Sequence, residues 1–248
     1  MKNDQSHGFD PKAAMDVEKF LGYEQGITHP HLIPSVLELI TRPGLKILDV
    51  GGASGFFLNE IMTKAGYAVE ATNLEFMAEY RDRQVNKQIR FLEGSILDSG
   101  IPDGSYDIVT FRHILHHLVA DNIRQTLGNQ QRALGEMARL VKPGGYLVFE
   151  EEVNRVWLCS RIVYFLSKWA CRLGIKSDFY FGAGSVVVSF MTPSEIEAML
   201  ERLRPQYDLQ LIKRQYQPWQ MGWRWKLSVL MSWVGSLLCV IRVGRRTC

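Results

Sequence analysis

The chain has 248 residues, of which 46% are hydrophobic and 22% charged, with a formal net charge of +3 at pH 7. This composition supports one large domain with a sizeable core. The charge is unevenly distributed: residues 1–150 carry 15 Lys or Arg and 19 Asp or Glu, whereas residues 151–248 carry 14 and 7. All six tryptophans lie in the basic part, among apolar runs rather than along a phosphate-tracking stripe, so we expect no nucleic-acid partner.

The cysteines and the N-terminus exclude two further classes. Cys159, Cys171, Cys239 and Cys248 are scattered without the spacing of a zinc site, and we expect reduced thiols and no metal. The first residues are polar and lack the apolar core of a signal peptide. We therefore expect a cytoplasmic protein, with peripheral contact at the inner face of a membrane as a further expectation.

The N-terminal segment predicts helices. Apolar residues recur at helical spacing from Pro11 to Ile40, with breaks near Gly26 and Pro30. Residues 41–44, which contain a Pro-Gly pair, end this segment before the first strand.

Short apolar runs then alternate with helical patterns. Strands that are separated by helices form parallel, doubly wound sheets, so we predict an α/β fold of the Rossmann-like type. Ligands of such sheets bind beyond the carboxyl ends of the strands. The expected strands are residues 46–50, 67–72, 89–92, 106–111 and 146–149, and the expected helices are residues 57–62, 75–85 and 118–140.

A glycine-rich turn joins the first strand to the first helix. In Asp49-Val50-Gly51-Gly52-Ala53-Ser54-Gly55 a carboxylate ends the strand, and the glycines let the backbone take positive φ and approach a ligand closely. The helix N-terminus that follows favours an electronegative partner. The turn lacks the Lys-Ser/Thr of a phosphate-binding loop and is not a clean G-x-G-x-x-G. It resembles motif I of the class I S-adenosylmethionine (SAM)-dependent methyltransferases, with Ala53 at the middle glycine.

Further stretches resemble the same family. The family's ribose-binding acid corresponds to Asn73, with Glu75 as an alternative, and its adenine-contacting position corresponds to Ser95. Residues 106–118 resemble the family's fourth strand and the segment after it, and residues 139–148 its entry to strand five. The resemblance implies a mostly parallel seven-stranded sheet, SAM as cofactor and S-adenosylhomocysteine as product. The cofactor-binding residues that it implies are Asp49, Gly51, Gly52, Gly55, Asn73, Leu74, Ser95, Ile96 and Arg112.

Three histidines follow the fourth expected strand. On a helical turn His113, His116 and His117 share one face, at the rim where the methyl group is expected. Histidine titrates near neutrality, so we expect one of them, His117 or His113 first, to contact the cofactor or acceptor or act as the general base. The alternative is that the cluster caps the strand and packs. We expect residues 150–152, three glutamates, to form a solvated or salt-bridged edge.

The C-terminal part begins with an expected lid. Residues 155–173 predict an amphipathic helix with a basic side and an apolar side. Such a helix lies on an anionic membrane or covers a hydrophobic site, and the alternative is a surface helix with its apolar face on the core. Residues 179–184 continue the lid as an aromatic loop.

The last 57 residues or so predict a helix from Thr192, a sixth strand at residues 207–212 and an apolar segment near the end. Residues 227–241 hold 15 uncharged residues, which as a helix measure roughly 22 Å, short of the ~30 Å of a bilayer core. We expect an interfacial or oligomerising helix there, ahead of a membrane span. The family's pattern would instead place an antiparallel strand.

The expected function is methyl transfer from SAM to an oxygen or carbon of a lipophilic small molecule, such as a quinone or isoprenoid, a lipid or a specialised metabolite. The alternative is a non-catalytic membrane- or partner-binding module that retains a SAM-like pocket. We expect peripheral membrane contact through residues 155–173 and 223–246, and a homodimer. The expected regions are a helical cap at 1–44, a SAM-binding core at 45–152, a substrate lid at 153–192, and a segment at 193–248 that completes the core.

Overall fold

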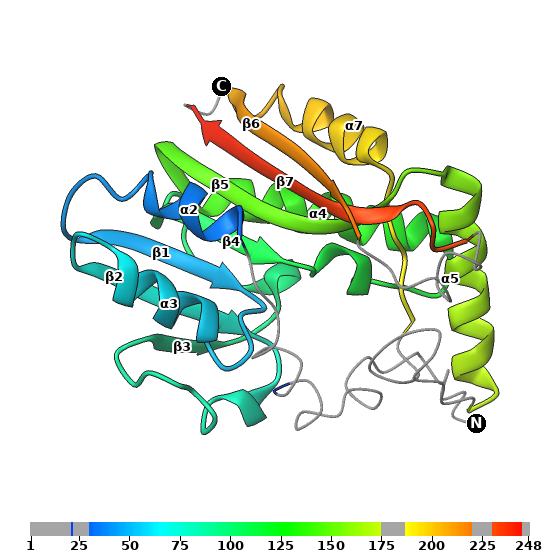
Figure 1. Ribbon diagram of the computed structural model, residues 1–248, viewed down its shortest axis with the longest axis horizontal. Coiled ribbons are helices and arrows are strands. Elements are labelled where there is room, and N and C mark those ends of the chain that lie inside the picture. Colours follow the sequence, from blue (N-terminus) through cyan, green and yellow to red (C-terminus); the bar gives the residue numbers. More distant parts are fainter. Residues whose placement is uncertain (1–20, 22–29, 175–186, 220–229, 245–248) are drawn as a thin grey trace, which may run out of the picture.

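The computed structural model describes residues 21, 30–174, 187–219 and 230–244. Its centre is a seven-stranded sheet in the order β3-β2-β1-β4-β5-β7-β6 (Figure 1). Every pairing among the first five strands is parallel, and β7 runs antiparallel to both of its neighbours. The strands are β1 Leu45–Val50, β2 Val69–Glu75, β3 Arg90–Glu93, β4 Tyr106–Arg112, β5 Val141–Asn154, β6 Leu209–Pro218 and β7 Val234–Val243.

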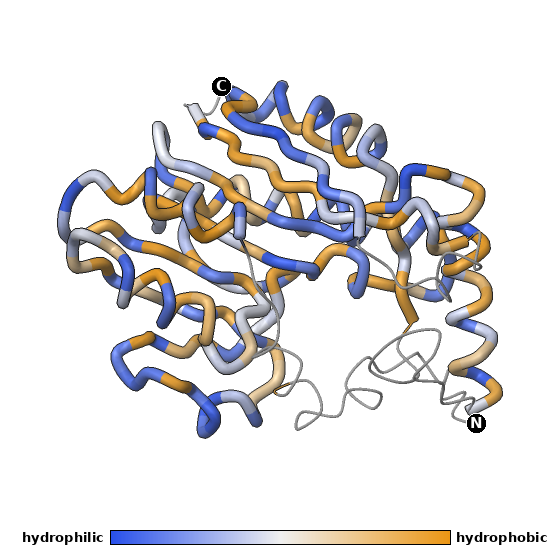
Figure 2. The backbone as a smooth tube through the Cα atoms, in the orientation of Figure 1, coloured by the Kyte–Doolittle hydropathy of each residue, from blue (hydrophilic) through white to orange (hydrophobic). Residues whose placement is uncertain are grey.

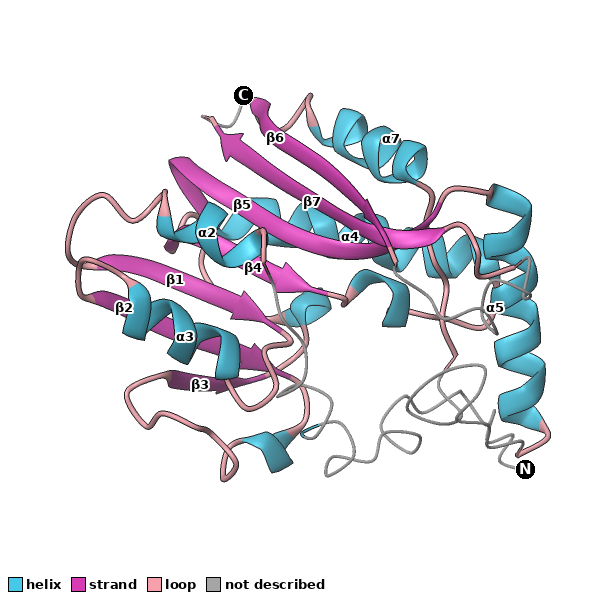
Figure 3. Ribbon diagram, in the orientation of Figure 1, coloured by secondary structure: helices cyan, strands magenta, loops and turns pink. Residues whose placement is uncertain are grey.

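Helices cover both faces of the sheet (Figure 3). One face packs against α4 and α7, and the other packs against α2 and α3. Successive side chains of a strand point to opposite faces, so Ile47 joins one core cluster and Leu48 the other. The described helices are α2 Leu32–Leu37, α3 Phe56–Lys64, α4 Ile123–Leu140, α5 Trp157–Arg172 and α7 Pro193–Leu203, with short 3-10 turns η2 Ala78–Tyr80, η3 Ile96–Asp98 and η4 Leu115–His117.

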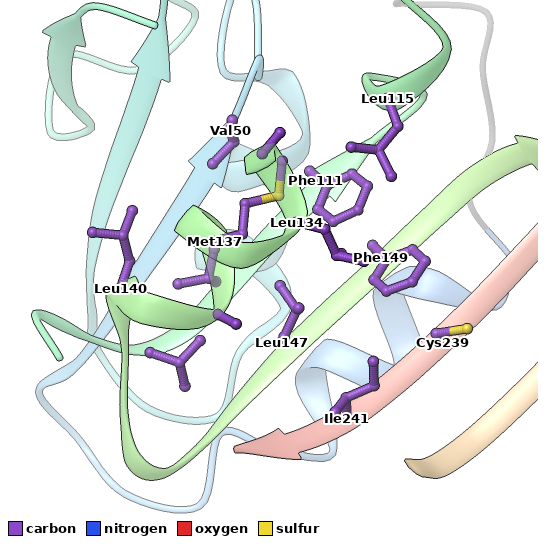
Figure 4. Packing of buried hydrophobic residues seen from close by; sticks show 14 of the residues in the cluster. Val50, Phe111, Leu115, Leu134, Met137, Leu140, Leu147, Phe149, Cys239 and Ile241 are labelled. Atoms are coloured by element: carbon purple, nitrogen blue, oxygen red, sulfur yellow. The ribbon is translucent and has the colours of Figure 1, made fainter. Parts of the chain in front are cut away.

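The larger core cluster lies between α4 and the strands beneath it (Figure 4). Phe111 and Phe149 stack with ring centroids 4.6 Å apart. Leu134 and Met137 of α4 are fully buried over this pair of strands. This packing fixes β4 against β5, and so places the segments that follow those two strands beside each other.

The predicted α/β fold, with its mostly parallel seven-stranded sheet, is confirmed, and the six strands expected before residue 213 are present with shifted ends. The helix expected at residues 75–85 is wrong. Glu75 completes β2, and its carboxylate accepts the N–H groups of Ala53 and Met77. The N–H of Val85 donates to the carbonyl of Ser54. These bonds hold the segment over the glycine turn, and only η2 is helical.

The helix expected from residue 118 begins later. Asn122 caps α4, because its side-chain oxygen accepts the N–H of Gln125, and the first helical residue is Ile123. The helix after residue 192 begins as expected, at Pro193. The loop expected at 179–184 and most of the expected N-terminal helix lie outside the described residues.

The helix expected at residues 227–241 is wrong where the structure describes it. Residues 234–243 form β7, which inserts between β5 and β6. An interior strand is buried on both faces, so it reads as one continuous apolar run that resembles a buried helix. The membrane contact expected through 223–246 is therefore excluded for 234–243, where Arg242 alone is exposed. Among the described residues, no helix combines the length and the apolar character needed to cross a bilayer.

Candidate active site

The carboxyl ends of β1 and β4 bring two opposite charges together. Asp49 pairs in register with Asn73 of β2 and Thr110 of β4. The fully buried Asp49 carboxylate accepts a hydrogen bond from the Thr110 hydroxyl at 2.9 Å and lies 3.4 Å from the Arg112 guanidinium. That guanidinium also lies 4.5 Å from the ring centroid of Phe57, in the first turn of α3. The sheet therefore presents an anion and a cation beside one helix N-terminus.

The glycine turn between β1 and α3 depends on the absence of side chains. Gly51 and Gly55 have φ values of 67° and 77°, in the left-handed region. A Cβ atom on Gly52 would lie 2.5 Å from Asp49 Oδ2 and 2.7 Å from Asn73 Oδ1. Ala53 also takes positive φ, at 44°, a conformation that costs an L-residue about 1 kcal/mol.

The end of β2 holds this turn in place. Asn73 Oδ1 accepts the N–H of Gly52 at 3.1 Å, and Asn73 Nδ2 donates to the carbonyl of Ala53 at 2.8 Å. Glu75 Oε2 accepts the N–H of Ala53 at 3.0 Å. Burial raises the pKa of Glu75 to about 7, although the hydrogen bonds from backbone N–H groups oppose this. The sequence pattern did not predict that Asn73 and Glu75 anchor the turn. The available signal was that these two polar residues alternate at the end of a buried strand and therefore share one face.

The other expected cofactor residues lie along the same edge. Ser95 is exposed, and its hydroxyl caps η3 by accepting the N–H of Leu97 at 3.2 Å. Leu74 and Ile96 are buried in the core cluster beneath α4. The Leu74 carbonyl accepts the N–H of Gly51 at 2.8 Å, which ties β2 to the glycine turn.

A buried histidine–glutamate pair lies beyond the ends of β4 and β5. His116 Nδ1 is 2.5 Å from Glu151 Oε1, and the same carboxyl group accepts the N–H groups of Ile114, Leu115 and Glu152. Burial raises the pKa of Glu151 to about 8 and lowers the pKa of His116 to about 3. Burial thus disfavours the charged form of each partner, whereas the backbone N–H groups oppose this at Glu151.

The other two histidines lie on either side of this pair. His113 takes positive φ, at 53°, and its side chain is 20% exposed, with Nδ1 3.7 Å from Glu152 Oε1. The rings of His116 and His117 are 4.0 Å apart. Burial, and secondly the neighbouring His116, lower the pKa of His117 well below its usual value. The expected single helical face is wrong, because only residues 115–117 are helical, yet His113 and His116 each have a ring nitrogen 3.7 Å from the Glu152 carboxyl group.

The acidic edge expected at residues 150–152 is also wrong. Glu150, Glu151 and Glu152 are all buried, with 7%, 0% and 9% of their surface exposed. β5 continues through them to Asn154, and β7 pairs along one edge of this extension. Burial, followed by the charges of the two neighbouring glutamates, raises the pKa of Glu152 to about 8.

Comparisons with known proteins agree with this geometry. Residues 48–149 match the family model described as a methyltransferase domain. The chain contains a class I SAM-dependent methyltransferase domain. The methyl donor of this family is SAM. The match spans the glycine turn, the end of β2 and the histidine segment.

The methyltransferase domain has relatives of several kinds. It is 30% identical over 130 residues to a ubiquinone/menaquinone biosynthesis C-methyltransferase of Cupriavidus metallidurans, covering 50% of this chain and 49% of that protein. It is also 30% identical over 125 residues to a hybrid PKS-NRPS synthetase of Acremonium, covering 46% of this chain and 3% of that protein. The chain thus spans a few per cent of the synthetases and about half of the C-methyltransferase.

Solved structures share the fold. A SAM-dependent methyltransferase of Methanosarcina mazei superposes with a TM-score of 0.60 at 17% identity, covering 88% of this chain and 98% of that one. The YcgJ protein of Bacillus subtilis superposes with a TM-score of 0.58 at 16% identity, covering 88% and 100%. At these identities the likeness concerns the fold alone.

The methyltransferase domain fits the amino-acid end of SAM. A methionine moiety carries an ammonium and a carboxylate, and Asp49 and Arg112 offer the complementary charges 3.4 Å apart. Because Gly52 has no Cβ, the Asp49 carboxylate can pack directly against the turn. At the ribose end, the side chain of Asn73 already bonds the glycine turn through both of its polar atoms. The predicted contacts are therefore better supported at the amino-acid end of SAM than at its ribose end.

Proposed function

We propose that the protein transfers the methyl group of SAM to an oxygen or carbon atom of a lipophilic small molecule. The observation that carries this proposal is the Asp49–Arg112 pair beside the glycine turn. The relatives that act in quinone biosynthesis or belong to PKS-NRPS synthetases support a quinone or isoprenoid, or a specialised metabolite, and a lipid is the third class. The activity of the whole chain and the identity of its methyl acceptor are part of this proposal.

The chain's own residues would orient the two reactants. Bound SAM supplies an electrophilic methyl group on its sulfonium. Asp49 would bind the ammonium of the methionine part and Arg112 its carboxylate, while Gly51, Gly52 and Gly55 permit close backbone approach. Holding the nucleophile in line with the methyl group supplies much of the rate enhancement of such a displacement. We keep Asn73, Leu74, Ser95 and Ile96 as predicted contacts of the nucleoside part.

We propose His113 as the general base. A base must reach the acceptor and titrate near the working pH. His116 is almost fully buried against Glu151, and its pKa is about 3. His117 also has a strongly lowered pKa. The side chain of His113 is 20% exposed, against 4% for His116, so it is the one that an acceptor can reach most easily. His116 and His117 would then position the segment.

The first experiment is calorimetric titration with SAM and S-adenosylhomocysteine. We expect micromolar binding by the wild type and at least a tenfold loss in Asp49→Asn and in Arg112→Gln, because each removes a charge-assisted contact worth about 1.5 kcal/mol or more. Glu60→Gln, which removes an ion pair with Lys64 on α3, is the matched control. The double variant Asp49→Asn/Arg112→Gln leaves no charge unpaired, so it separates lost binding from lost folding.

Turnover is tested with methyl-labelled SAM and short-chain hydroxyquinone and phenol acceptors. We expect label in the organic phase, and a loss of about 100-fold in kcat in His113→Asn. Asparagine tolerates positive φ, so this variant preserves the backbone at position 113. Unchanged turnover in His113→Asn would remove His113 as the base. Failure of the folded wild type to bind SAM would instead favour the non-catalytic binding module.

Several expectations remain predictions alongside this function. They are the homodimer, the cytoplasmic location with peripheral membrane contact through residues 155–173, and the division into regions 1–44, 45–152, 153–192 and 193–248. Residues 223–229 of the second expected membrane contact lie outside the described residues.

A further inference from the structure

Helix α5 faces outward with its apolar side. Figure 1 places it at the edge of the molecule, beyond the carboxyl ends of the parallel strands, and Figure 2 shows hydrophobic colour along it. Its large apolar residues lie at helical spacing and are about half exposed. They are Trp157 (57%), Leu158 (58%), Phe165 (58%), Leu166 (46%), Trp169 (60%) and, directly after the helix, Leu173 (55%).

The inward side of α5 combines small apolar and polar residues: Val163 joins a core cluster, and polar groups beside it bond to the body. Arg161 is buried and forms an ion pair with Glu195 of α7. Ser167 exchanges hydrogen bonds with the backbone of Val188. The Tyr164 hydroxyl donates to the carbonyl of Ala120 at 3.1 Å. The expected alternative, a surface helix with its apolar face on the core, is therefore wrong for the residues described.

The inward packing also fixes the orientation of the helix. Ser160, Ser167 and Tyr164 form hydrogen bonds with the body of the protein, and Arg161 forms an ion pair with it. Rotation of the apolar stripe inward would break these interactions, which fixes the orientation of α5. The 16 residues of α5 make this stripe roughly 24 Å long.

The charges around the stripe select its partner. The residues from Asn154 to Leu173 include no acid, and both Arg155 and Arg172 are exposed at the two ends of the helix. Tryptophans also lie near both ends, as they do where proteins meet the headgroup region of a bilayer. An apolar stripe flanked by cations fits an anionic lipid surface, since Lys and Arg near such a surface are attracted to its headgroups.

Neighbouring strands extend the surface at the N-terminal end of α5. The N–H of Arg155 donates to the carbonyl of Trp233 at 3.0 Å, and the N–H of Trp219 donates to the carbonyl of Val234 at 3.2 Å. Trp233 is 45% exposed and Trp219 is 36% exposed. Two further tryptophans therefore lie near the start of the helix.

We infer that the outward face of α5 is a membrane-contact surface that seats the protein on an anionic bilayer. The helix would lie in the plane of the interface, with Phe165 and Trp169 among the acyl chains and Arg172 at the phosphates. This inference extends the proposed function. Its biological role rests on that function, because a lipophilic acceptor concentrates in the same bilayer. The binding itself does not require catalysis.

Vesicle flotation tests this surface. We expect the full chain to float with vesicles of 30% phosphatidylglycerol in phosphatidylcholine at low salt. The double variant Phe165→Ser/Trp169→Ser should lower the partition coefficient at least tenfold, and Arg172→Gln about fivefold. Ile212→Ser, which removes a side chain that is 58% exposed on β6, is the matched control and should float like the wild type. All these side chains are exposed, so unchanged melting temperatures should accompany the losses.

Three results would overturn the inference. The first is failure of the wild type to float while it binds SAM, which would leave the proposed function standing. The second is a dimer in light scattering that Phe165→Asp converts to a monomer, because a second copy would then cover α5. The third is protection of Trp157 and Trp169 from hydroxyl radicals in the isolated monomer, which would mean that the chain covers the face itself. Flotation without SAM binding would keep the surface and refute the proposed function.

Discussion

Replacement of Glu152 by Gln should weaken the pH dependence of stability between pH 6.5 and 8.0, to which the buried Glu75 and Glu151 also contribute. In the folded protein, burial raises the pKa of Glu152 to about 8, whereas the ordinary value is 4.5. An acid whose folded pKa is raised holds a proton that the unfolded chain releases, so its contribution to stability is lost as the pH rises toward 8. The amide of Gln resembles the protonated acid and does not titrate.

The size of the effect follows from the width of that interval. One proton taken up on folding changes the unfolding free energy by about 1.4 kcal/mol per pH unit. Over 1.5 pH units the wild type should lose roughly 2 kcal/mol more than Glu152→Gln, which is a difference in Tm of about 4 to 8 °C for a chain of this size. The titration of His116, with a pKa of about 3, lies below this interval.

Urea unfolding followed by circular dichroism at pH 6.5, 7.0, 7.5 and 8.0 measures the two slopes. Glu201→Gln, at an exposed carboxylate on α7, is the control and should retain the wild-type slope. Parallel slopes for the wild type and Glu152→Gln would refute the assignment of a buried, protonated Glu152.

Four further measurements test other parts of the fold. Thr192→Ala removes the hydroxyl that accepts the N–H of Glu195 in a capping box, and it should lower the unfolding free energy by about 1 kcal/mol in urea; no change would argue against the cap. Phe149→Ala, in the core under α4, should lower the unfolding free energy by about 3 to 5 kcal/mol in the same assay, and a loss below about 1 kcal/mol would contradict its burial. Ala53→Gly should raise the unfolding free energy by up to about 1 kcal/mol, because glycine relieves the strain of the positive φ. Burial raises the pKa of Cys239 to about 12, so this thiol should resist labelling by a disulfide reagent at pH 8 until the protein unfolds, whereas Cys171 should react earlier.

The strands of the parallel half could be predicted because each one leaves a signature in a few adjacent residues. Buried apolar runs such as residues 46–50 and 106–111 are bounded by Gly, Pro or polar turns, and tertiary packing agrees with that local pattern. The glycine turn was found for the same reason, since its positive φ values demand the residues that the sequence supplies.

The C-terminal strand was implied by the family resemblance but could not be predicted from its own residues, because its environment is not local. β7 pairs with β5 and β6, neither of which adjoins it in the sequence, and the run of Val, Leu and Ile is equally compatible with a helix. The length of the uncharged run argued against a membrane span, but pairing with β5 and β6 determined that the segment is a strand.

Side-chain partners across the sheet were also invisible in the sequence. Glu151 and His116 are 35 positions apart, and three adjacent glutamates resemble a solvated edge until β7 covers them. In α5, the helical spacing correctly predicted an amphipathic helix, but which side meets the body depends on Glu195 and Ala120, two residues outside the helix.

The central place of β7 also has a consequence for synthesis on the ribosome. A nascent chain that has reached β6 already holds all four parallel pairings, but β5 still has a free edge, and β6 has no strand to join. The 14-residue edge of β5, with its apolar side chains, remains available to other chains until Val243 has emerged. A stall or premature stop before residue 234 should therefore yield an aggregating product rather than a smaller folded domain.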